Sequence, residues 1–464
     1  MLLIFNLFGL FLYRQTRKLN AVQMSLLLVL TLVKEMNRFR DLPFKVSVVE
    51  IPQSVSSFGI GFRGSRIISI VFLLVFVGVA GCESLDAERD GWDIAQGKVF
   101  DNRFQSRLEK LRLEAGFPGA TAAYVLENGY HATFAVGYAD LEKAIRMTPD
   151  ARMLSGSTGK SFVAAVVLNL VQEGRIDLDA PISEWFGKEP WFHRLPNADE
   201  ITLRMLLRHQ SGLMDHVHSE KFIVMIREKM RRFGADACLS PLELVSIVFD
   251  TKPLFPAGQG YAYSDTNYIL AGMIIERVTG NSYYEELTQR FIKPLDLNRT
   301  SPANSRYLAG LVPGYTQDDT FLMLSGKVMR DGKLIFNPQT EWTGGGLVTN
   351  SRDLARWAAL LYTGRAMPGK YLHELLKTVP KDLSQQKQFG PDVSYGLGVT
   401  VRKTRFGFAY GHRGWAPGYL SLFEYYPAQG VAVALQINEQ GHDVTAYLEA
   451  LVAVIVSQQR TAGR

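Results

Sequence analysis

The chain has 464 residues, of which 47% are hydrophobic and 21% are charged, and its formal net charge at pH 7 is +6. This length and hydrophobic content suffice for one large core or two lobes, which excludes a disordered or fibrous protein. Residues 1–81 hold nine of the 51 Lys and Arg and three of the 45 Asp and Glu, so the remainder has 42 of each sign. Because the body is neutral, the composition does not indicate nucleic-acid binding.

The N-terminal region has the pattern of a secretory signal. Arg63 and Arg66 precede an apolar run at residues 67–80, and acidic residues follow from Glu83. The run has about 14 residues, fewer than the ~20 that span a bilayer as a helix. The sequence V-A-G-C, which ends at Cys82, resembles a bacterial lipobox. We therefore expect a membrane-anchored lipoprotein of the bacterial cell envelope, lipidated at Cys82 and facing the periplasm or exterior, with a plain membrane anchor as the alternative.

Residues 1–81 are interpreted as an N-terminal extension with this signal segment, and residues 82–100 as a linker. A signal segment normally begins close to the initiator, so residues 1–65 suggest a start codon assigned too far upstream. The chain has two cysteines. Lipid on Cys82 leaves Cys238 without a partner, so no disulfide is expected even in an oxidising compartment.

The body begins with a helix and two strands. Residues 101–115 have the charged amphipathic pattern of a helix. Residues 120–126 and 131–138 have the composition of strands and are separated by the turn sequence E-N-G at 127–129. This order predicts a hairpin.

The stretch at residues 154–174 predicts a helix with a reactive N-terminus at Ser157. Its apolar residues are almost continuous over 162–170, which is typical of a fully buried helix. In a helix that begins at Ser157, residue i+3 lies on the same face, so the amine of Lys160 can reach the Ser157 hydroxyl. A serine becomes a useful nucleophile when a neighbouring base takes its proton, and a partly neutral lysine can serve. A second S-x-x-K at 384–387 has polar surroundings, so we interpret it as a surface segment.

The middle of the chain is mainly helical. We predict helices at residues 202–210 and 220–233, after the capping boxes that start at Ser240 and Ser282, and at 267–278 and 354–362. Strands are predicted at 395–402, 406–411, 419–426 and 431–438, and a last helix at 444–456. This order indicates an α+β fold, with an antiparallel sheet flanked by helices and an inserted all-helical lobe at about residues 180–350. We expect the functional site in a cleft between the lobes.

Histidines in the helical region allow a metal hydrolase to be considered. His209, His216 and His218 fall within ten residues, near Asp215 and Glu220, and H-x-H spacing can bind zinc. Neither an H-x-H-x-D-H run nor an H-E-x-x-H sequence occurs. We therefore predict no metal site.

Two later sequences complete a chemical pattern with Ser157. Tyr263 opens Y-S-D just before a predicted helix, and H-R-G-W at 412–415 follows a predicted strand. The order S-x-x-K, Y-x-N, H-x-G resembles the serine β-lactamase and penicillin-binding family, in particular the branch of class C β-lactamases, D-alanyl-D-alanine carboxypeptidases, D-aminopeptidases and related esterases. The resemblance covers about residues 100–460 and includes H-Q-S-G-L at 209–213. It implies a β-lactamase-like serine hydrolase domain, which we place at residues 101–464.

The resemblance also implies roles for the matching residues. Ser157 attacks a carbonyl and becomes acylated, while Lys160 and Tyr263 share the proton transfers. A free tyrosine has a pKa of about 10, so Tyr263 acts as a base only with Lys160 beside it. The backbone amides of Ser157 and Trp415 are expected to hold the oxyanion. No cofactor is implied.

His412 and Gly414 are expected to line the strand that orients the substrate, but two neighbouring positions depart from the family's pattern. Asp265 stands where Asn is usual, so a side chain that can donate a hydrogen bond becomes one that only accepts. This exchange puts recognition of a substrate amide carbonyl in doubt. The carboxylate of Asp265 can instead pair with Lys160, which raises the pKa of the lysine and weakens it as a base. Arg413 replaces the usual Thr or Ser. We hypothesise that Arg413 attracts a substrate carboxylate, with a solvent-facing arginine as the alternative.

We therefore predict a serine hydrolase that acts through an acyl-enzyme on an amide, β-lactam or ester carbonyl in the cell envelope. The expected substrate is a D-amino-acid peptide, such as a peptidoglycan peptide, or a β-lactam. A carboxylesterase of the same fold is the first alternative, and a non-catalytic peptidoglycan-binding protein, favoured only by Asp265, is the second. The other expected partner is the membrane, through the N-terminal lipid.

Overall fold

The computed structural model describes residues 94–319, 324–367, 370–379 and 392–462. The predicted signal segment, Cys82 and most of the linker lie outside the described residues, as does the second S-x-x-K sequence at 384–387. Among the helices in these ranges, none combines the length and the apolar character that crossing a bilayer requires.

One eight-stranded sheet organises the fold, and both ends of the body contribute to it. Its strands are β1 (Gly119–Leu126), β2 (His131–Asp140), β3 (Ile145–Arg146), β11 (Val393–Tyr395), β12 (Thr400–Thr404), β13 (Gly407–Ala416), β14 (Tyr419–Tyr426) and β15 (Val431–Ile437). Their order is β11-β12-β13-β14-β15-β1-β2-β3. All neighbouring pairs are antiparallel, and β1 pairs with β15 through Ala123 opposite Ala434. The predicted α+β fold, with a sheet built from both ends of the domain, is confirmed.

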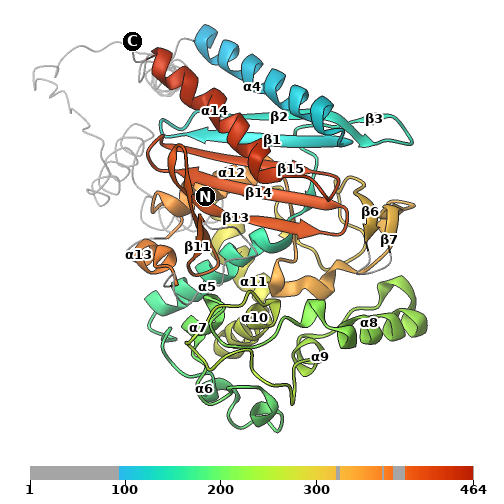
Figure 1. Cartoon of the computed structure of the whole chain (residues 1–464), viewed down its shortest axis with the longest axis vertical. Helices are drawn as coiled ribbons and strands as arrows, with labels where there is room; N and C mark the ends of the chain where they lie inside the picture. The colour runs from blue at the N-terminus through green and yellow to red at the C-terminus, as the bar shows by residue number, and fades with distance from the viewer. Residues whose placement is uncertain (1–93, 320–323, 368–369, 380–391, 463–464) are drawn as a thin grey trace, which may run out of the picture. The chain divides into compact units, whose positions relative to one another are not determined.

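Two helices cover one face of this sheet (Figure 1). α4 (Ile94–Ala115) and α14 (Val444–Ala462) pack against each other and against the strands. Phe104 of α4, Leu448 of α14 and Tyr124 of β1 are all completely buried in this layer. Burying one large apolar side chain contributes about 1.5–3 kcal/mol. This layer therefore fastens the two ends of the domain to each other.

The opposite face is covered by α12 (Ser351–Tyr362), which contacts β1, β14 and β15. Phe162 of α5 (Lys160–Gln172) stacks on Trp357 of α12 with ring centroids 4.0 Å apart. The Trp357 Nε1–H donates to Ser161 Oγ at 3.0 Å. α5 is buried on all sides, which explains why its apolar sequence is continuous.

The middle of the chain forms a lobe that begins as predicted. Its helices are α6 (Ser183–Phe186), α7 (Leu203–Leu207), α8 (Glu220–Phe233), α9 (Pro241–Ser246), α10 (Asp265–Thr279) and α11 (Tyr283–Leu287), followed by a π-helical turn at Thr288–Ile292. Both predicted capping boxes are present, one between Ser240 and Glu243 and one between Ser282 and Glu285. In each box the serine side chain accepts the backbone N–H of the glutamate, and the glutamate side chain accepts the backbone N–H of the serine. These two hydrogen bonds stabilise the start of the helix.

The lobe is not helical to residue 350, contrary to the prediction. After Ile292 the chain forms β5 (Ser301–Pro302), β6 (Tyr315–Asp319), β7 (Leu324–Lys327), β8 (Met329–Arg330), β9 (Lys333–Leu334) and β10 (Leu347–Thr349). β10 lies between β5 and β4 (Met153–Leu154), and β4 leads into the reactive serine. These strands are too short for a periodic pattern to reveal them.

The strand predicted at 395–402 is two strands, β11 and β12. Gly398 separates them with φ of +66°, and a Cβ there would lie 2.6 Å from the Lys160 carbonyl oxygen. The turn therefore needs glycine both for its backbone angle and for its close approach to α5. β13 is longer than predicted, so His412 and Trp415 lie within the strand and not beyond it.

Candidate active site

Ser157 occupies a tight turn immediately before α5. The turn is the 3-10 helix η2 (Gly156–Gly159), and the α-helix begins at Lys160, three residues later than predicted. In a 3-10 turn, residues i and i+3 lie one above the other. The predicted pairing therefore survives, and Lys160 Nζ donates to Ser157 Oγ at 3.0 Å.

Glycines allow two backbone segments to meet at this turn. Gly156 has φ of +52°, and a Cβ there would lie 2.3 Å from the Trp415 carbonyl oxygen of β13. A Cβ on Gly414 would lie 1.9 Å from the carbonyl oxygen of Ser155. Distances this short exclude any side chain, so the serine turn and β13 are in direct backbone contact.

Lys160 has a completely buried side chain with three acceptors around its ammonium group. These are Ser157 Oγ at 3.0 Å, Asp265 Oδ1 at 2.6 Å and the carbonyl oxygen of Gly344. Ser157 Oγ and the Gly344 carbonyl oxygen accept hydrogen bonds from Nζ, whereas Asp265 Oδ1 forms an ion pair with it. Asp265, at the start of α10, thus pairs with Lys160 as the sequence suggested.

Tyr263 is brought to the same point. Its side chain hydrogen-bonds with Ser157, and its ring centroid lies 5.0 Å from Lys160 Nζ. Burial, and then the charge of Asp265, raise the pKa of Tyr263 well above its usual value, although the bond to Ser157 acts in the opposite direction. The tyrosine is therefore a neutral phenol at physiological pH.

His209 positions Tyr263, a role that the sequence did not reveal. Its ring centroid lies 4.2 Å from that of Tyr263. Its Nδ1 accepts the backbone N–H of Ser264 at 3.1 Å and lies 3.2 Å from Asn267 Nδ2. Burial and the charge of Lys160 lower the pKa of His209 well below its usual value, so the ring is neutral.

The four predicted residues of β13 divide between its two faces. Trp415 is 38% exposed and lines a cavity beside Ser157, and Arg413 is exposed on the same face of the strand. His412 and Gly414 face the other way and do not line the cavity. His412 Nε2 pairs with the Tyr395 hydroxyl at 2.8 Å, and burial lowers the pKa of His412 to about 3.

His412 and Gly414 both lie on β13 next to the candidate catalytic residues. The ring centroid of His412 lies 6.3 Å from that of Tyr263, and Gly414 approaches the backbone of Ser155 just before the reactive serine. Trp415 and Ala416 of the same strand line the cavity. The role of His412 and Gly414 in orienting a substrate stays a prediction.

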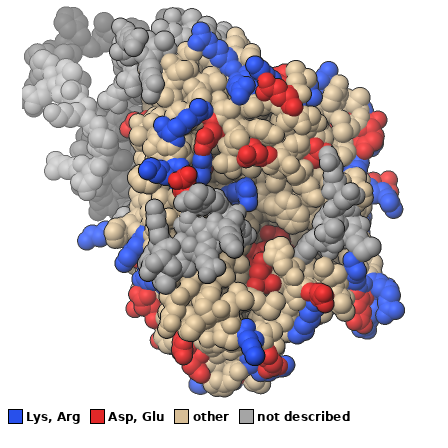
Figure 2. Space-filling view, in the orientation of Figure 1, with Lys and Arg blue, Asp and Glu red and all other residues tan. Residues whose placement is uncertain are grey.

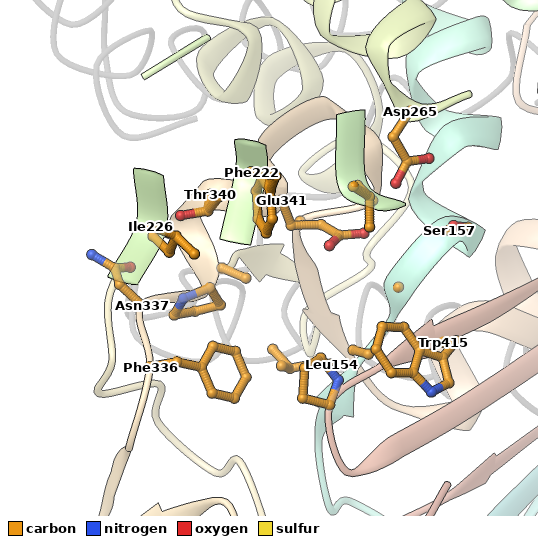
Figure 3. A pocket seen from close by; sticks show the side chains of 18 of the residues that line it. Leu154, Ser157, Phe222, Ile226, Asp265, Phe336, Asn337, Thr340, Glu341 and Trp415 are labelled. Atoms are coloured by element: carbon orange, nitrogen blue, oxygen red, sulfur yellow. The ribbon is translucent and has the colours of Figure 1, made fainter. Parts of the chain in front are cut away.

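The cavity has a volume of about 280 Å³ and is open to Ser157. One part of its wall is apolar and includes Leu154, Phe222, Ile226, Met230, Phe336 and Pro338. Another part is acidic and consists of Asp215, Asp265 and Glu341 (Figure 3). Figure 2 shows acidic surface inside a hollow on one face of the molecule.

Asp215 and Glu341 were not predicted as site residues. Burial and the charge of Asp265 raise the pKa of each carboxyl to about 7. Asp215 lies two residues after S-G-L and Glu341 lies three residues before G-G-G, so their positions near family motifs were the available signal.

The histidines of the alternative metal site do not converge. His209 packs against Tyr263, His216 Nδ1 lies 3.0 Å from Thr266 Oγ1, and the side chain of His218 is 76% exposed. Within the ranges that the structure describes, no group of three His, Cys, Asp or Glu side chains is arranged to hold a metal ion.

Comparisons with known proteins agree with this geometry. The model of the Beta-lactamase family matches residues 100–456. The structure of a D-stereospecific amidohydrolase from Streptomyces sp. is 29% identical, with a TM-score of 0.63 over 75% of this chain and 96% of that chain. The D-amino acid amidase from Ochrobactrum anthropi SV3, complexed with L-phenylalanine amide, is 27% identical, with a TM-score of 0.65 over 79% and 99%.

A curated relative adds an envelope enzyme to this set. The teichoic acid D-alanine hydrolase of Staphylococcus aureus is 28% identical over 218 residues, which are 47% of this chain and 49% of that protein. The chain spans 64% or less of the length of the curated relatives that it matches.

Proposed function

The chain belongs to the Beta-lactamase family, and on that premise we propose that it is a serine hydrolase that cleaves an amide or ester through an acyl-enzyme at Ser157. The observation that carries this proposal is the 3.0 Å hydrogen bond from Lys160 Nζ to Ser157 Oγ at the wall of a cavity. A buried cation stabilises the negative charge that develops on Oγ as it attacks a carbonyl carbon.

The Ser157 proton leaves toward Tyr263. The ammonium group of Lys160 is paired with Asp265 and has no lone pair to accept this proton, so the phenol oxygen of Tyr263, which hydrogen-bonds with Ser157, is the available base. Tyr263 passes its own proton to the departing amine or alcohol as it receives the proton of Ser157, and its charge does not change. The raised pKa keeps Tyr263 protonated, so the relay proceeds through a neutral phenol and does not need a tyrosinate.

The carbonyl oxygen becomes an anion in the tetrahedral intermediate. We assign its stabilisation to the backbone amides of Ser157 and Trp415, because η2 and β13 meet at Gly156 beside the cavity. Removing one such donor typically costs about 10²–10³ in kcat. Water that enters the cavity then hydrolyses the acyl-serine.

The proposed substrates are D-amino-acid amides, peptides or esters of the cell envelope. The names of the Streptomyces, Ochrobactrum and Staphylococcus relatives support this class. β-Lactams and simple carboxylic esters are the competing substrates. We also propose that Cys82 carries lipid and anchors the enzyme, which the sequence pattern of residues 63–82 supports.

A second candidate function is binding of envelope peptides without turnover. The ion pair of Lys160 with Asp265 favours it, because an ammonium group cannot accept a proton from Ser157. Binding without turnover requires that Tyr263 also fails to relay that proton.

The test is the intact mass of the purified full chain after exposure to a serine-acylating probe. We expect an adduct in the wild type and none in Ser157→Ala. The matched control is Ser384→Ala, which removes the serine of the second S-x-x-K sequence and should leave the adduct in place. A folded wild-type protein without an adduct would instead support the binding function.

A further inference from the structure

The acidic wall of the cavity carries more negative charge than its surroundings balance. Three carboxylates line it, from Asp215, Asp265 and Glu341. Lys160 pairs with Asp265 at 2.6 Å. The next basic side chain is His218, whose Nε2 lies 3.7 Å from Asp215 Oδ2 and whose side chain is 76% exposed. Asp215 and Glu341 therefore lack a strong cationic partner among the described residues.

Their oxygen atoms are available to a ligand. Asp215 Oδ1 accepts the backbone N–H of Val217 at 3.3 Å and of Asp265 at 3.1 Å, whereas Oδ2 has only the distant His218. Glu341 makes no hydrogen bond or ion pair with any residue that the structure describes. Figure 3 shows the side chains of Glu341 and Asp265 turned toward the cavity.

Glu341 also lies close to the reacting atoms. A Cβ on Gly344 would lie 3.7 Å from Glu341 Oε1 and 3.5 Å from Asp265 Oδ2. The carbonyl oxygen of the same glycine accepts a hydrogen bond from Lys160, which in turn donates to Ser157. The carboxylate of Glu341 is thus next to the ion pair of Lys160 and Asp265, and Lys160 donates to Ser157.

His216 supplies a third acceptor, and its tautomer follows from its partners. Thr266 Oγ1 donates its one proton to the Met214 carbonyl oxygen at 3.0 Å. His216 Nδ1, 3.0 Å from the same Oγ1, must then be the donor, which leaves Nε2 with a lone pair. The residue is 2% exposed and lines the cavity, and no described residue hydrogen-bonds with Nε2. Burial lowers the pKa of His216 to about 4, so this lone pair is present at neutral pH.

We propose that Asp215, His216 and Glu341 form a subsite for the primary ammonium group of an aminoacyl substrate. This inference rests on the proposed acyl-enzyme function and specifies its substrate: an amide or ester whose acyl part carries a free amine. An ammonium group offers three N–H donors and one positive charge, and the three side chains offer acceptors and negative charge. The apolar wall formed with Phe222, Ile226 and Phe336 would receive the side chain of the amino acid.

The same chemistry argues against other acyl groups at this wall. An N-acylated amine has no charge and one N–H, so it would leave two buried carboxylates without a cation. A carboxylate-bearing acyl group would be repelled by them. Burial and the charge of Asp265 already raise the pKa of Asp215 and of Glu341 to about 7, and a bound cation would offset that repulsion.

The experiment compares the p-nitrophenyl esters of D-alanine and of N-acetyl-D-alanine on the full chain at pH 7, below the α-amino pKa of about 7.7–8.0. The two esters share a leaving group and differ in the ammonium group. We expect Ser157-dependent kcat/KM to favour the free amine by about 10² or more, since the N-acetyl ester leaves the buried carboxylates without a charged partner. Asp215→Asn and Glu341→Gln should each reduce that preference at least about tenfold.

The preference is a ratio measured on one preparation, so loss of folded protein cancels from it. Glu220→Gln, which neutralises an exposed carboxylate of α8, is the matched control and should keep the wild-type preference. Equal use of both esters by the wild type, or an unchanged preference in both variants, would overturn the subsite but not the hydrolase. Absence of Ser157-dependent cleavage of either ester would overturn both proposals.

Discussion

Lys160 Nζ lies 2.6 Å from Asp265 Oδ1 and 3.0 Å from Ser157 Oγ, so one buried cation serves both an anion and the nucleophile. The resemblance to the family implies Asn where this chain has Asp265. The exchange keeps the size of the side chain and adds a negative charge next to the ammonium group. That charge also raises the pKa of Tyr263, Asp215 and Glu341.

Asp265→Asn should therefore increase the rate of acylation at neutral pH. Removing the anion lowers the pKa of Tyr263 and removes the partner that favours the charged form of Lys160. We expect kcat/KM for an activated ester at pH 7 to rise about tenfold, the equivalent of one pKa unit. Stopped-flow measurement of the acylation burst between pH 5 and 9 tests this.

The same variant should be less stable than the wild type. An unpaired buried ammonium costs several kcal/mol unless it loses its proton, so the melting temperature should fall. A decrease of the acylation rate by about 10² would show the opposite role, with Asp265 accepting a proton from Lys160.

Gly156→Ala should disable catalysis through the backbone. The new Cβ would lie 2.3 Å from the Trp415 carbonyl oxygen at a residue with φ of +52°. Separation of η2 from β13 would misplace both proposed oxyanion amides, so we expect kcat to fall by about 10² or more. Gly174→Ala is the matched control, because Gly174 also has positive φ (+67°) but has nothing within 4 Å of its Cβ position. Equal losses of activity in the two variants would refute the role of the close backbone contact.

The sequence predicted elements whose cause is local. The helix at 220–233 and the strand at 419–426 have the predicted limits, and the spacing of Ser157 and Lys160 led to their hydrogen bond. Tyr263 needed more than spacing, because only the order of three motifs connected it to Ser157, 106 positions away in the chain.

What the sequence could not predict depends on tertiary contacts. Asp215 and Glu341 are ordinary surface residue types, and only the packing of η2, α8 and α10 makes them the wall of a cavity. His412 fitted the family motif, but the sequence did not show that its side chain is buried beside Tyr263 and hydrogen-bonded with Tyr395. The break between β11 and β12 depends on the approach of Gly398 to α5, which lies more than 200 positions earlier in the chain.

Arg413→Ala tests the hypothesis that this arginine attracts a substrate carboxylate. Arg413 is exposed on the face of β13 that also bears Trp415. If it acts at the rim of the cavity, KM for a substrate that ends in a carboxylate should rise about threefold to tenfold, with kcat unchanged and a weaker effect at high salt. The comparison substrate is the corresponding methyl ester, whose KM should stay constant. An unchanged KM for the acid would identify Arg413 as a solvent-facing side chain.

Cys82→Ser tests the predicted anchor, which lies outside the described residues. Expressed in a bacterial host with radiolabelled palmitate, the wild-type chain should incorporate label and sediment with membranes, because small residues precede Cys82 as in a lipobox. The variant should incorporate none. Cys238→Ser is the control, since it removes the other cysteine and leaves the lipobox intact. Label in Cys82→Ser would contradict lipidation at this position.

The crowded carboxylates should also give the protein a characteristic pH dependence of stability. Asp215 and Glu341 have pKa values raised to about 7 in the folded chain, through burial and the charge of Asp265, while Lys160 acts in the opposite direction on both. A carboxyl whose pKa is raised by folding stabilises the protein fully below its unfolded pKa of about 4, and this contribution is lost as pH rises through about 7. His218, near Asp215, reduces the loss only while it is protonated.

Asp215→Asn and Glu341→Gln should therefore lose less stability between pH 5 and pH 8 than the wild type. The expected difference is roughly 1–3 kcal/mol in the free energy of unfolding, because each neutral amide removes one ionisation that the folded state resists. Urea unfolding at both pH values, with Glu220→Gln as the exposed control, measures it. Equal losses of unfolding free energy in the wild type and all three variants would mean that Asp215 and Glu341 ionise in the folded chain as they do in solvent. The cavity would then hold no unfavourable negative charge that a ligand cation could neutralise.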